Sequence, residues 1–283
     1  MKFHFNVKAT ILLLIIANLS YAQNGVDIIK QLVARQKQIT SLTYTLKKTE
    51  RLDGELKSKV SFFKINIKPL KLYIRQISPT EGIEAIFCTG ENNNKVVINP
   101  NKFPWVTISL DPYCHELTKS EHHTVYESGM TYMTSLLENV LTKYSAELNE
   151  MIKNDGPVNY GSYSCYLITM YDKHFKYVSY TVGSGETVYS IAKKLKINAY
   201  MILEKNPKIK NSNDVKKGDI IKVPNDYSQK MILYVDKKTY FPVLIKVYDE
   251  VGLFEQYDYS NIVFNPVFAS DEFLKSNKKY NFK

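Results

Sequence analysis

Residues able to bind a metal or to act in nucleophilic catalysis gather between residues 114 and 127. Cys114 precedes His115, and the pair His122-His123 follows in the same stretch. Their spacing matches no zinc-binding pattern. Adjacent residues on an extended strand point to opposite sides, so Cys114 and His115 would not act on one substrate. We therefore interpret these histidines as solvated loop residues.

Catalytic motifs are missing from the sequence. It contains no Gly-x-Ser-x-Gly, no His-Glu-x-x-His and no glycine-rich phosphate loop. The carboxylates of Glu121, Glu127 and Glu138 could form a glycosidase pair in space, but nothing in the sequence distinguishes them from other acids. The sequence thus predicts a protein that is not an enzyme, with no catalytic residues, no metal and no cofactor.

A small α+β unit is predicted over residues 180–224. A β-prone run at residues 180–182 ends in Gly183-Ser184-Gly185, and Thr187 can cap a following helix. Apolar residues at helical spacing then predict one buried helical face: Val188, Ile191, Ala192 and Leu195.

The same stretch continues with a second helix and a strand. Asn198 can cap the helix, and Asn206-Pro207 ends it, because the residue before a proline avoids the α region. Gly218-Asp219 then turns the chain into a strand at residues 220–223, which Pro224 ends. The predicted order is strand, helix, helix, strand.

This stretch resembles a LysM domain over its full length. The resemblance rests on these residues in their order: Gly185-Glu186-Thr187-Val188, Ile191-Ala192, Ile202 with Asn206-Pro207, and Gly218 with Ile221, Val223 and Pro224. Glu186 stands where the family has aspartate, and Val188 and Ile202 stand where it has leucine. The resemblance implies binding of glycans that contain N-acetylglucosamine, most often peptidoglycan.

The resemblance also implies a shallow sugar groove between two loops. The glycan-binding residues would be Gly185, Glu186, Thr187 and Val188 in the first loop and Asn206, Pro207, Lys208 and Ile209 in the second. Structural roles remain open for three of them. Thr187 could serve only as a helix cap, Pro207 as a helix stop and Val188 as a core residue.

Residues 1–22 have the pattern of a signal peptide. Lys2 and Lys8 make a positive start, an apolar run at residues 9–19 is too short to span a membrane, and Ser20-Tyr21-Ala22 offers a cleavage site. No cysteine follows the run to carry a lipid anchor, and no later stretch reads as a transmembrane segment. We expect an exported protein of the periplasm or cell envelope.

Charge and cysteine content fit export without deciding a partner. The net charge is +10, and removal of Lys2 and Lys8 leaves +8, scattered along the chain. This favours solubility and weak attraction to an anionic envelope, and we expect no nucleic acid partner. Cys88 and Cys114 could form a disulfide, or all three cysteines, including Cys165, could be buried thiols.

The flanking chain is rich in predicted strands. Hydrophobic periodicity predicts helices at residues 26–39 and 134–152 and an irregular region at 111–132. Alternation and turn signals predict strands at 41–52, 56–67, 70–77, 83–89, 95–98, 105–110, two more within 156–176, and 229–235, 243–249 and 254–260. The strand pattern stops before residue 180 and resumes after residue 224, so we expect an insertion between neighbouring strands.

The flanking chain resembles the LolA/LolB-like periplasmic lipoprotein carriers over residues 23–178 and 229–283. The resemblance rests on residues 70–77 followed by Pro79 and residues 82–87, and on residues 233–249 with their Asp-x-x-Thr-x-x-Pro turn. It implies an α+β fold, in which a curved antiparallel sheet wraps over packed helices around an apolar cavity. The predicted domains are 23–178, the insertion 179–225, and 226–283.

Together these features predict an exported, non-catalytic envelope protein. The inserted domain would bind peptidoglycan or a related glycan, and the LolA-like domain would bind a lipid, a lipoprotein or a protein partner. Two alternatives stay open at this point. The protein could be a peptidoglycan hydrolase that the inserted domain targets to the wall, or the inserted domain could mediate protein contacts only.

Overall fold

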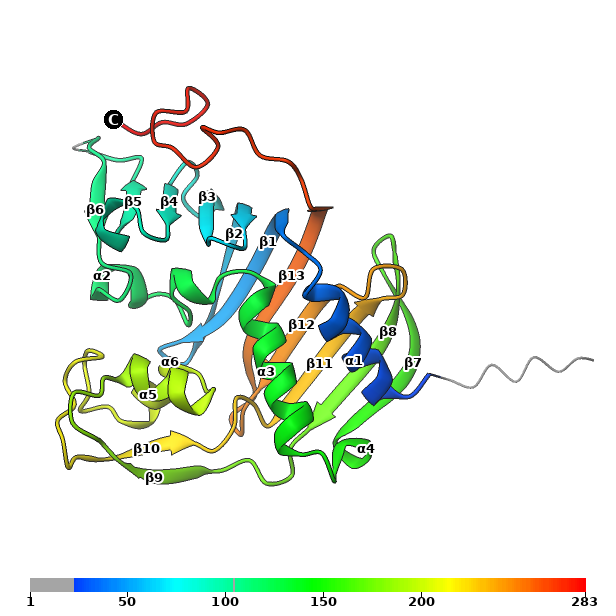
Figure 1. Cartoon of the computed structure of the whole chain (residues 1–283). Coiled ribbons are helices and arrows are strands. Elements are labelled where there is room, and N and C mark those ends of the chain that lie inside the picture. The colour runs from blue at the N-terminus through cyan, green and yellow to red at the C-terminus, as the bar shows by residue number, and fades with distance from the viewer. Residues whose placement is uncertain (1–22, 104) are drawn as a thin grey trace, which may run out of the picture.

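A large antiparallel sheet organises the chain. The structure is a computed structural model that describes residues 23–103 and 105–283, so the predicted signal peptide lies outside the described residues. The sheet has 11 strands in the order β6-β5-β4-β3-β2-β1-β13-β12-β11-β8-β7 (Figure 1). The strands are β1 Ser41–Leu52, β2 Glu55–Asn66, β3 Lys71–Ser78, β4 Glu84–Cys88, β5 Val96–Asn99, β6 Ile108–Leu110, β7 Ile152–Tyr160, β8 Tyr163–Tyr171, β11 Lys230–Asp236, β12 Pro242–Tyr248 and β13 Leu253–Phe264.

Local turn chemistry sets the first hairpin. Strands β1 and β2 pair from Ser41 opposite Asn66 to Leu52 opposite Glu55. The two residues between them, Asp53 and Gly54, have φ angles of 54° and 81°. Such positive angles match the right-handed twist of a tight hairpin, and Asp-Gly is the sequence that adopts them readily.

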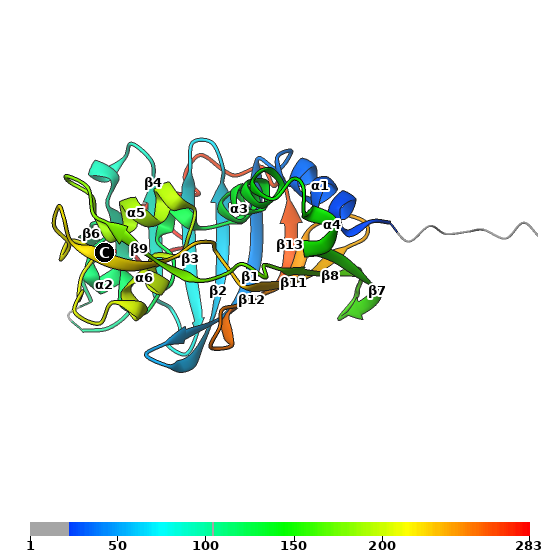
Figure 2. The ribbon, with the colours of Figure 1, turned by 90° about the horizontal axis from the view of Figure 1, so that it is seen from below.

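Helices cover one face of half of this sheet (Figures 1 and 2). They are α1 Gly25–Gln36, α3 Met130–Lys143 and α4 Leu148–Met151. Their apolar residues share one core with the inner face of the sheet; fully buried members include Ile28, Ile29, Leu32, Leu137, Leu233, Val243 and Ile245. The other half of the sheet is covered by the loop region that contains α2 His115–Thr118 and the 3-10 turn Val125–Glu127.

Residues 177–224 form a separate unit, which we call the inserted segment. Its elements are β9 Tyr177–Thr181, α5 Val188–Leu195, α6 Ala199–Lys205 and β10 Ile220–Pro224. Strands β9 and β10 pair only with each other, whereas β8 before them and β11 after them pair directly in the large sheet. The predicted α+β class, with a large antiparallel sheet, packed helices and a βααβ insertion, is confirmed.

The helix predicted over residues 134–152 is wrong at both ends. Helix α3 begins at Met130 and ends at Lys143, and strand β7 already begins at Ile152. Tertiary contacts end the helix, because Lys143 and Tyr144 both bond the Asp226 carboxylate. The Tyr144 hydroxyl also reaches Asp172, so this turn of the chain is held by residues distant in sequence.

Two smaller expectations also change. The strand predicted over residues 105–110 is limited to Ile108–Leu110, and β9 begins at Tyr177 and not at Tyr180.

The cysteines are free thiols, with Cys88 and Cys165 buried. Among the described residues no helix is long and apolar enough to cross a bilayer.

Candidate glycan-binding loops and ligand cavity

The eight predicted glycan-binding residues lie on two adjacent loops of the inserted segment. One loop joins β9 to α5, and the other follows α6. The loops are bonded together, since the Val188 N–H donates to the Ser212 carbonyl at 2.9 Å and the Tyr189 N–H donates to the Ser212 hydroxyl at 3.2 Å. The structure therefore brings both groups of predicted residues to one end of the segment.

Most of these side chains build the loops. The Glu186 carboxylate accepts from the Gly183 N–H, the Tyr180 hydroxyl and the Lys194 ammonium, at 2.8 to 2.9 Å. The backbone N–H of Gly183, followed by Lys194 and Tyr180, lowers the Glu186 pKa to about 2. Thr187 caps α5 by accepting from the Ser190 N–H.

The remaining residues divide into packed and exposed groups. Val188 is fully buried in the segment core, and Ile209 packs against that core. The Asn206 side chain donates to the Ile202 and Lys222 carbonyls and accepts from the Lys222 N–H, so it ties α6 to β10. Gly185, Pro207 and Lys208 are exposed and free to face a ligand.

A cavity of about 370 Å³ lies between the large sheet and its loop cover. Apolar side chains from five neighbouring strands form much of its floor: Tyr44, Leu46, Phe63, Ile74, Ala85, Val96 and Ile98. Pro112, Leu117, Val125 and Met133 contribute from the cover side. A largely apolar cavity of this size is typical of a small-molecule or lipid site.

Charged groups stand at one part of the cavity wall. Lys48 and Lys59 from the sheet both pair with Glu121 from the cover. Burial, together with the nearby Lys48 charge, lowers the Lys59 pKa to about 8. His123, Glu127 and the hydroxyl-bearing Tyr257 also line the wall, so an otherwise apolar cavity carries polar groups that can orient a ligand head.

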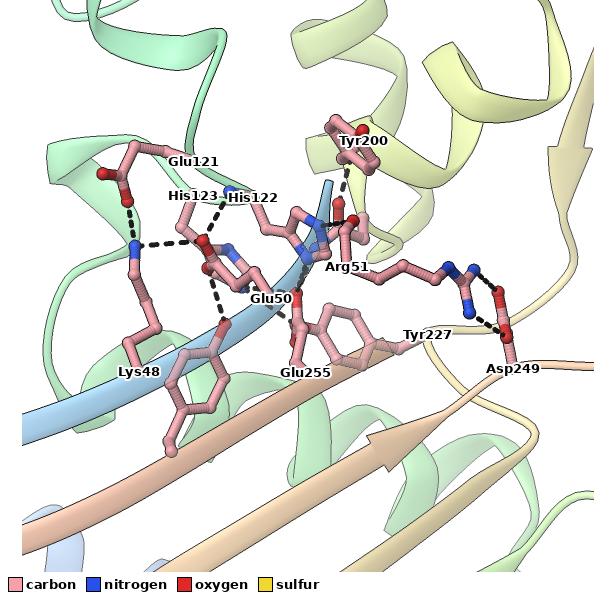
Figure 3. Close-up of polar contacts among 12 residues, drawn as sticks. Lys48, Glu50, Arg51, Glu121, His122, His123, Tyr200, Tyr227, Asp249 and Glu255 are labelled. Atoms are coloured by element: carbon pink, nitrogen blue, oxygen red, sulfur yellow. Dashed lines mark hydrogen bonds and ion pairs between the residues drawn. The ribbon is translucent and has the colours of Figure 1, made fainter. Parts of the chain in front are cut away.

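Behind this wall lies a buried charge cluster centred on Glu255 of β13 (Figure 3). Its carboxylate accepts from His122 Nδ1 at 2.9 Å, the Tyr227 hydroxyl at 2.8 Å and Asn198 Nδ2 at 2.8 Å, and it pairs with His123 Nε2 at 3.1 Å. Burial alone would oppose ionisation of Glu255, but the two neighbouring histidines outweigh it and hold the pKa well below its usual range.

The interpretation of His122 and His123 as solvated loop residues is wrong. His122 is buried, and its ring nitrogens face two acceptors, Glu255 and the Arg51 carbonyl at 2.8 Å. Burial opposes the charge on His123, but Glu255 and Glu127 raise its pKa to about 10. The sequence offered no signal for these partners, because Glu255 is more than a hundred residues away.

The donor set of Glu50, His122 and Glu255 has the composition of a metal site, with candidate ligand atoms within 4.8 Å of one another. However, hydrogen bonds and ion pairs within the protein already involve these candidate ligand groups. The two His122 nitrogens lie against Glu255 and the Arg51 carbonyl, while Glu50 accepts from the Tyr257 hydroxyl at 3.2 Å and pairs with Lys48 at 3.1 Å. Each candidate ligand group already has hydrogen-bond or ion-pair partners within the protein, so we assign this cluster a structural role.

Of the three carboxylates considered for a glycosidase pair, Glu121 and Glu127 both line the cavity, whereas Glu138 does not. Glu121 pairs with Lys48 and Lys59, Glu127 lies beside His123, and Glu138 pairs with Lys37 on the outside of α3. Cys114 and His115 lie at the start of α2, with His115 exposed, and neither belongs to the buried cluster.

The inserted segment docks onto this cluster. Besides the Asn198 bond to Glu255, the Tyr200 ring stacks on His122 with centroids 4.5 Å apart, and its hydroxyl accepts from the Asp53 N–H. Arg51 binds Glu204 of α6 and Asp249 of the large sheet domain. Met201 is fully buried in the core of the large domain. Polar and apolar contacts together fix the segment against the sheet.

Comparison with known proteins identifies the inserted segment. Its residues 180–224 match the family model of the LysM domain, the interval expected from the sequence. Residues 180–224 are a LysM domain. Residues 39–165 of the large domain match a family described as a protein of unknown function, DUF1571.

One curated relative and several solved structures are similar to the chain. The endolysin of Bacillus phage B103 is 26% identical over 163 residues, which span 57% of this chain and 56% of the endolysin. The match thus covers little more than half the length of that relative.

Among solved structures, the Mycobacterium tuberculosis lipoprotein LppX has 14% identity and a TM-score of 0.41 over 86% of this chain and 96% of LppX. LprF from Mycobacterium bovis has 9% identity and a TM-score of 0.40 over 88% and 96%. A LolA superfamily protein from Nitrosomonas europaea has 8% identity and a TM-score of 0.29 over 87% and 96%. The fold assignment follows from the strand order and the helices of this chain and not from these similarities.

Stability should fall as the pH rises from about 6.5 to about 8. The raised His123 pKa of about 10 means that the folded protein keeps a proton which the unfolded chain releases above about pH 6.5. One such group lowers the free energy of unfolding by at most about 1.4 kcal/mol per pH unit. Lys59, with its pKa of about 8, acts in the opposite direction above that pH. Urea denaturation across this range measures the slope.

His123→Gln keeps a donor but cannot titrate, so this variant should show a flatter slope than the wild type. The exposed Asn213 provides the control, since Asn213→Gln changes no titratable group and should leave the slope unchanged. On the acid side, stability should fall below about pH 4.5, because Glu255 and Glu50 have lowered pKa values and must be protonated there. If the slope between about pH 6.5 and 8 is unchanged in His123→Gln, the raised pKa does not belong to His123.

Asn198→Ser should separate the two roles of Asn198. Serine can still cap α6, but it lacks the amide donor that reaches Glu255. We expect a loss of about 1.5–3 kcal/mol in the free energy of unfolding, as for other hydrogen bonds to buried charges. Asn198→Ala should cost about 1 kcal/mol more through the lost cap. The exposed Asn213→Ser is the matched control, and equal stability of Asn198→Ser and wild type would refute the docking role.

Proposed function

We propose that the protein is an exported, non-catalytic cell-envelope protein with two binding sites. Its LysM domain binds peptidoglycan or a related glycan that contains N-acetylglucosamine, and the cavity of its large domain holds the apolar part of a lipid or lipoprotein. The observation that carries this proposal is the juxtaposition of the LysM domain with an open apolar cavity in one docked structure.

The two LysM loops support the glycan site. Glu186, Thr187 and Asn206 organise the backbone, and Val188 and Ile209 anchor it to the LysM core. The exposed Gly185, Pro207 and Lys208 are then left to contact the sugar, together with backbone N–H and C=O groups. Preformed loops of this kind bind without a large ordering cost.

The cavity supports an amphipathic ligand. Its apolar floor suits an acyl chain, and the Lys48–Glu121–Lys59 group and His123 suit a polar head at the same wall. A purely polar ligand would make no favourable apolar contacts with the aromatic and aliphatic floor. A lipid or the acyl part of a lipoprotein therefore fits the lining better than a sugar or a nucleotide.

The hydrolase alternative has support from the endolysin similarity alone. A glycosidase needs two carboxyl groups open to the sugar, about 5 to 10 Å apart. Among the described residues Glu50 and Glu255 are close together but buried, and each already accepts hydrogen bonds. Glu121 and Glu127 line the cavity, but Glu121 pairs with Lys48 and Lys59 and Glu127 pairs with His123. Release of soluble fragments from labelled peptidoglycan would revive this alternative.

Glycan binding should depend on the exposed loop residues. The double variant Pro207→Ser/Lys208→Glu leaves the loop-building side chains in place, and we expect it to bind purified sacculi at least about tenfold more weakly, because two contacts are lost or reversed in charge. Co-sedimentation with sacculi measures this. Lys193→Glu, an equal charge change on the exposed side of α5, should bind like wild type. If both variants bind equally, the loops are not the site.

Ligand binding in the cavity should be lost when its space is filled. Ser61→Phe/Ala85→Phe places two rings into the cavity from its floor. We expect the wild type to bind a fluorescent fatty acid such as cis-parinaric acid and the double variant to bind it at least about tenfold more weakly. Val263→Phe, at an exposed position of β13, is the control. Unchanged fluorescence enhancement in the double variant would contradict an internal site.

A further inference from the structure

Exposed apolar side chains gather in the loop between β5 and β6 and at the start of β6. Phe103 is 82% exposed, Trp105 51%, Val106 48% and Ile108 37%. Trp105 is the only tryptophan of the chain. A soluble protein rarely shows large apolar side chains so close together unless the surface binds something.

The loop backbone presents these side chains outward. The Trp105 N–H donates to the Lys102 carbonyl at 2.7 Å, which closes a tight turn. Trp105 has a φ angle of 60°, a left-handed conformation that is unfavourable for a bulky residue. Strain of this kind is usually retained at sites with a function.

Exposed lysines lie in the loop and in the C-terminal tail. Residues 99–110 contain Lys102 and no acidic residue, and residues 276–283 add Lys278, Lys279 and Lys283, again without an acid. These four lysines are exposed. The tail lies beside the loop, since the Lys283 N–H donates to the Thr107 hydroxyl at 2.8 Å, and Figure 1 shows it (red) next to the ends of β3 to β6.

The strands that flank the loop lie next to the cavity. Val96 and Ile98 on β5, which leads into the loop, line the cavity, and so does Pro112 shortly after β6. Ile98 pairs directly with Ile108. An apolar molecule that met the loop would therefore be next to the cavity floor.

We propose that residues 102, 103 and 105–108, with the tail 276–283, bind the surface of an anionic lipid bilayer. Phe103, Trp105 and Val106 enter the boundary between head groups and acyl chains, where aromatic side chains are favoured. The lysines contact anionic head groups. The inference rests on the proposed function in one respect. Binding to the bilayer would allow a lipid ligand to be exchanged between the membrane and the cavity.

The composition of the surface favours a bilayer over other occupants. A sugar would stack on the flat face of a ring, and the exposed Val106 and Ile108 would contribute little to it. A protein partner or a second copy would need a complementary surface, whereas an apolar tip with exposed lysines in the loop and in the neighbouring tail matches the layered polarity of an anionic membrane.

Trp105 is a built-in probe for the test. On addition of vesicles of equal parts phosphatidylglycerol and phosphatidylcholine, we expect its emission to shift to shorter wavelength, with weaker binding to pure phosphatidylcholine. Phe103→Ser/Val106→Ser should bind the anionic vesicles at least about tenfold more weakly, and Lys102→Gln about fivefold more weakly. Ile220→Ser, a matched loss of an exposed apolar side chain on the LysM domain, should bind like wild type.

Several outcomes would overturn the proposal. These are no emission shift with vesicles, equal vesicle binding by Phe103→Ser/Val106→Ser, a shift produced by sacculi in place of vesicles, or a shift that depends on protein concentration alone. Fatty-acid binding by the soluble protein separates this test from that of the cavity. If the wild type binds cis-parinaric acid but not vesicles, only the bilayer site fails; if it binds vesicles but no fatty acid, only the cavity proposal fails.

Discussion

The ionised carboxylate of Glu255, which has no exposed surface, is the constraint on which the arrangement of the two domains depends. An unpaired charge at this depth would be prohibitively unfavourable, so it requires donors on every side. Two come from the histidines of the loop cover, one from Tyr227, and one from Asn198 of the LysM domain. The network closes only when the sheet, the cover and the LysM domain are all in place.

This closure gives the LysM domain a defined orientation relative to the cavity. The cover that carries His122 and His123 also forms a wall of the cavity, and its Tyr113 packs on Tyr189 of α5 at 5.2 Å. The cover is thus held between the two proposed binding sites. On the proposed function, contact with the glycan would set the direction in which the cavity and the loop between β5 and β6 face within the envelope.

Local patterns predicted much of the fold. Asp53-Gly54 predicted the first hairpin, and Thr187 and Asn198 predicted the starts of α5 and α6, because turns and caps depend on a few neighbouring residues. The same reasoning failed for the helix predicted over residues 134–152. Its continuation past Lys143 had suitable periodicity, but Asp172 and Asp226 bond this region and the chain turns there.

The sequence by itself determined the presence and limits of the LysM domain, the α+β class and the interruption of one sheet by an insertion, since each follows from short-range spacing and turn residues. Only the tertiary structure decided that the buried His122 and the partly buried His123 are partners of Glu255, that a cavity remains beneath the cover, and that Asn198 is a docking residue as well as a cap. The reason is that charge pairing and enclosed space depend on residues far apart in the chain, and no local pattern records which of them meet.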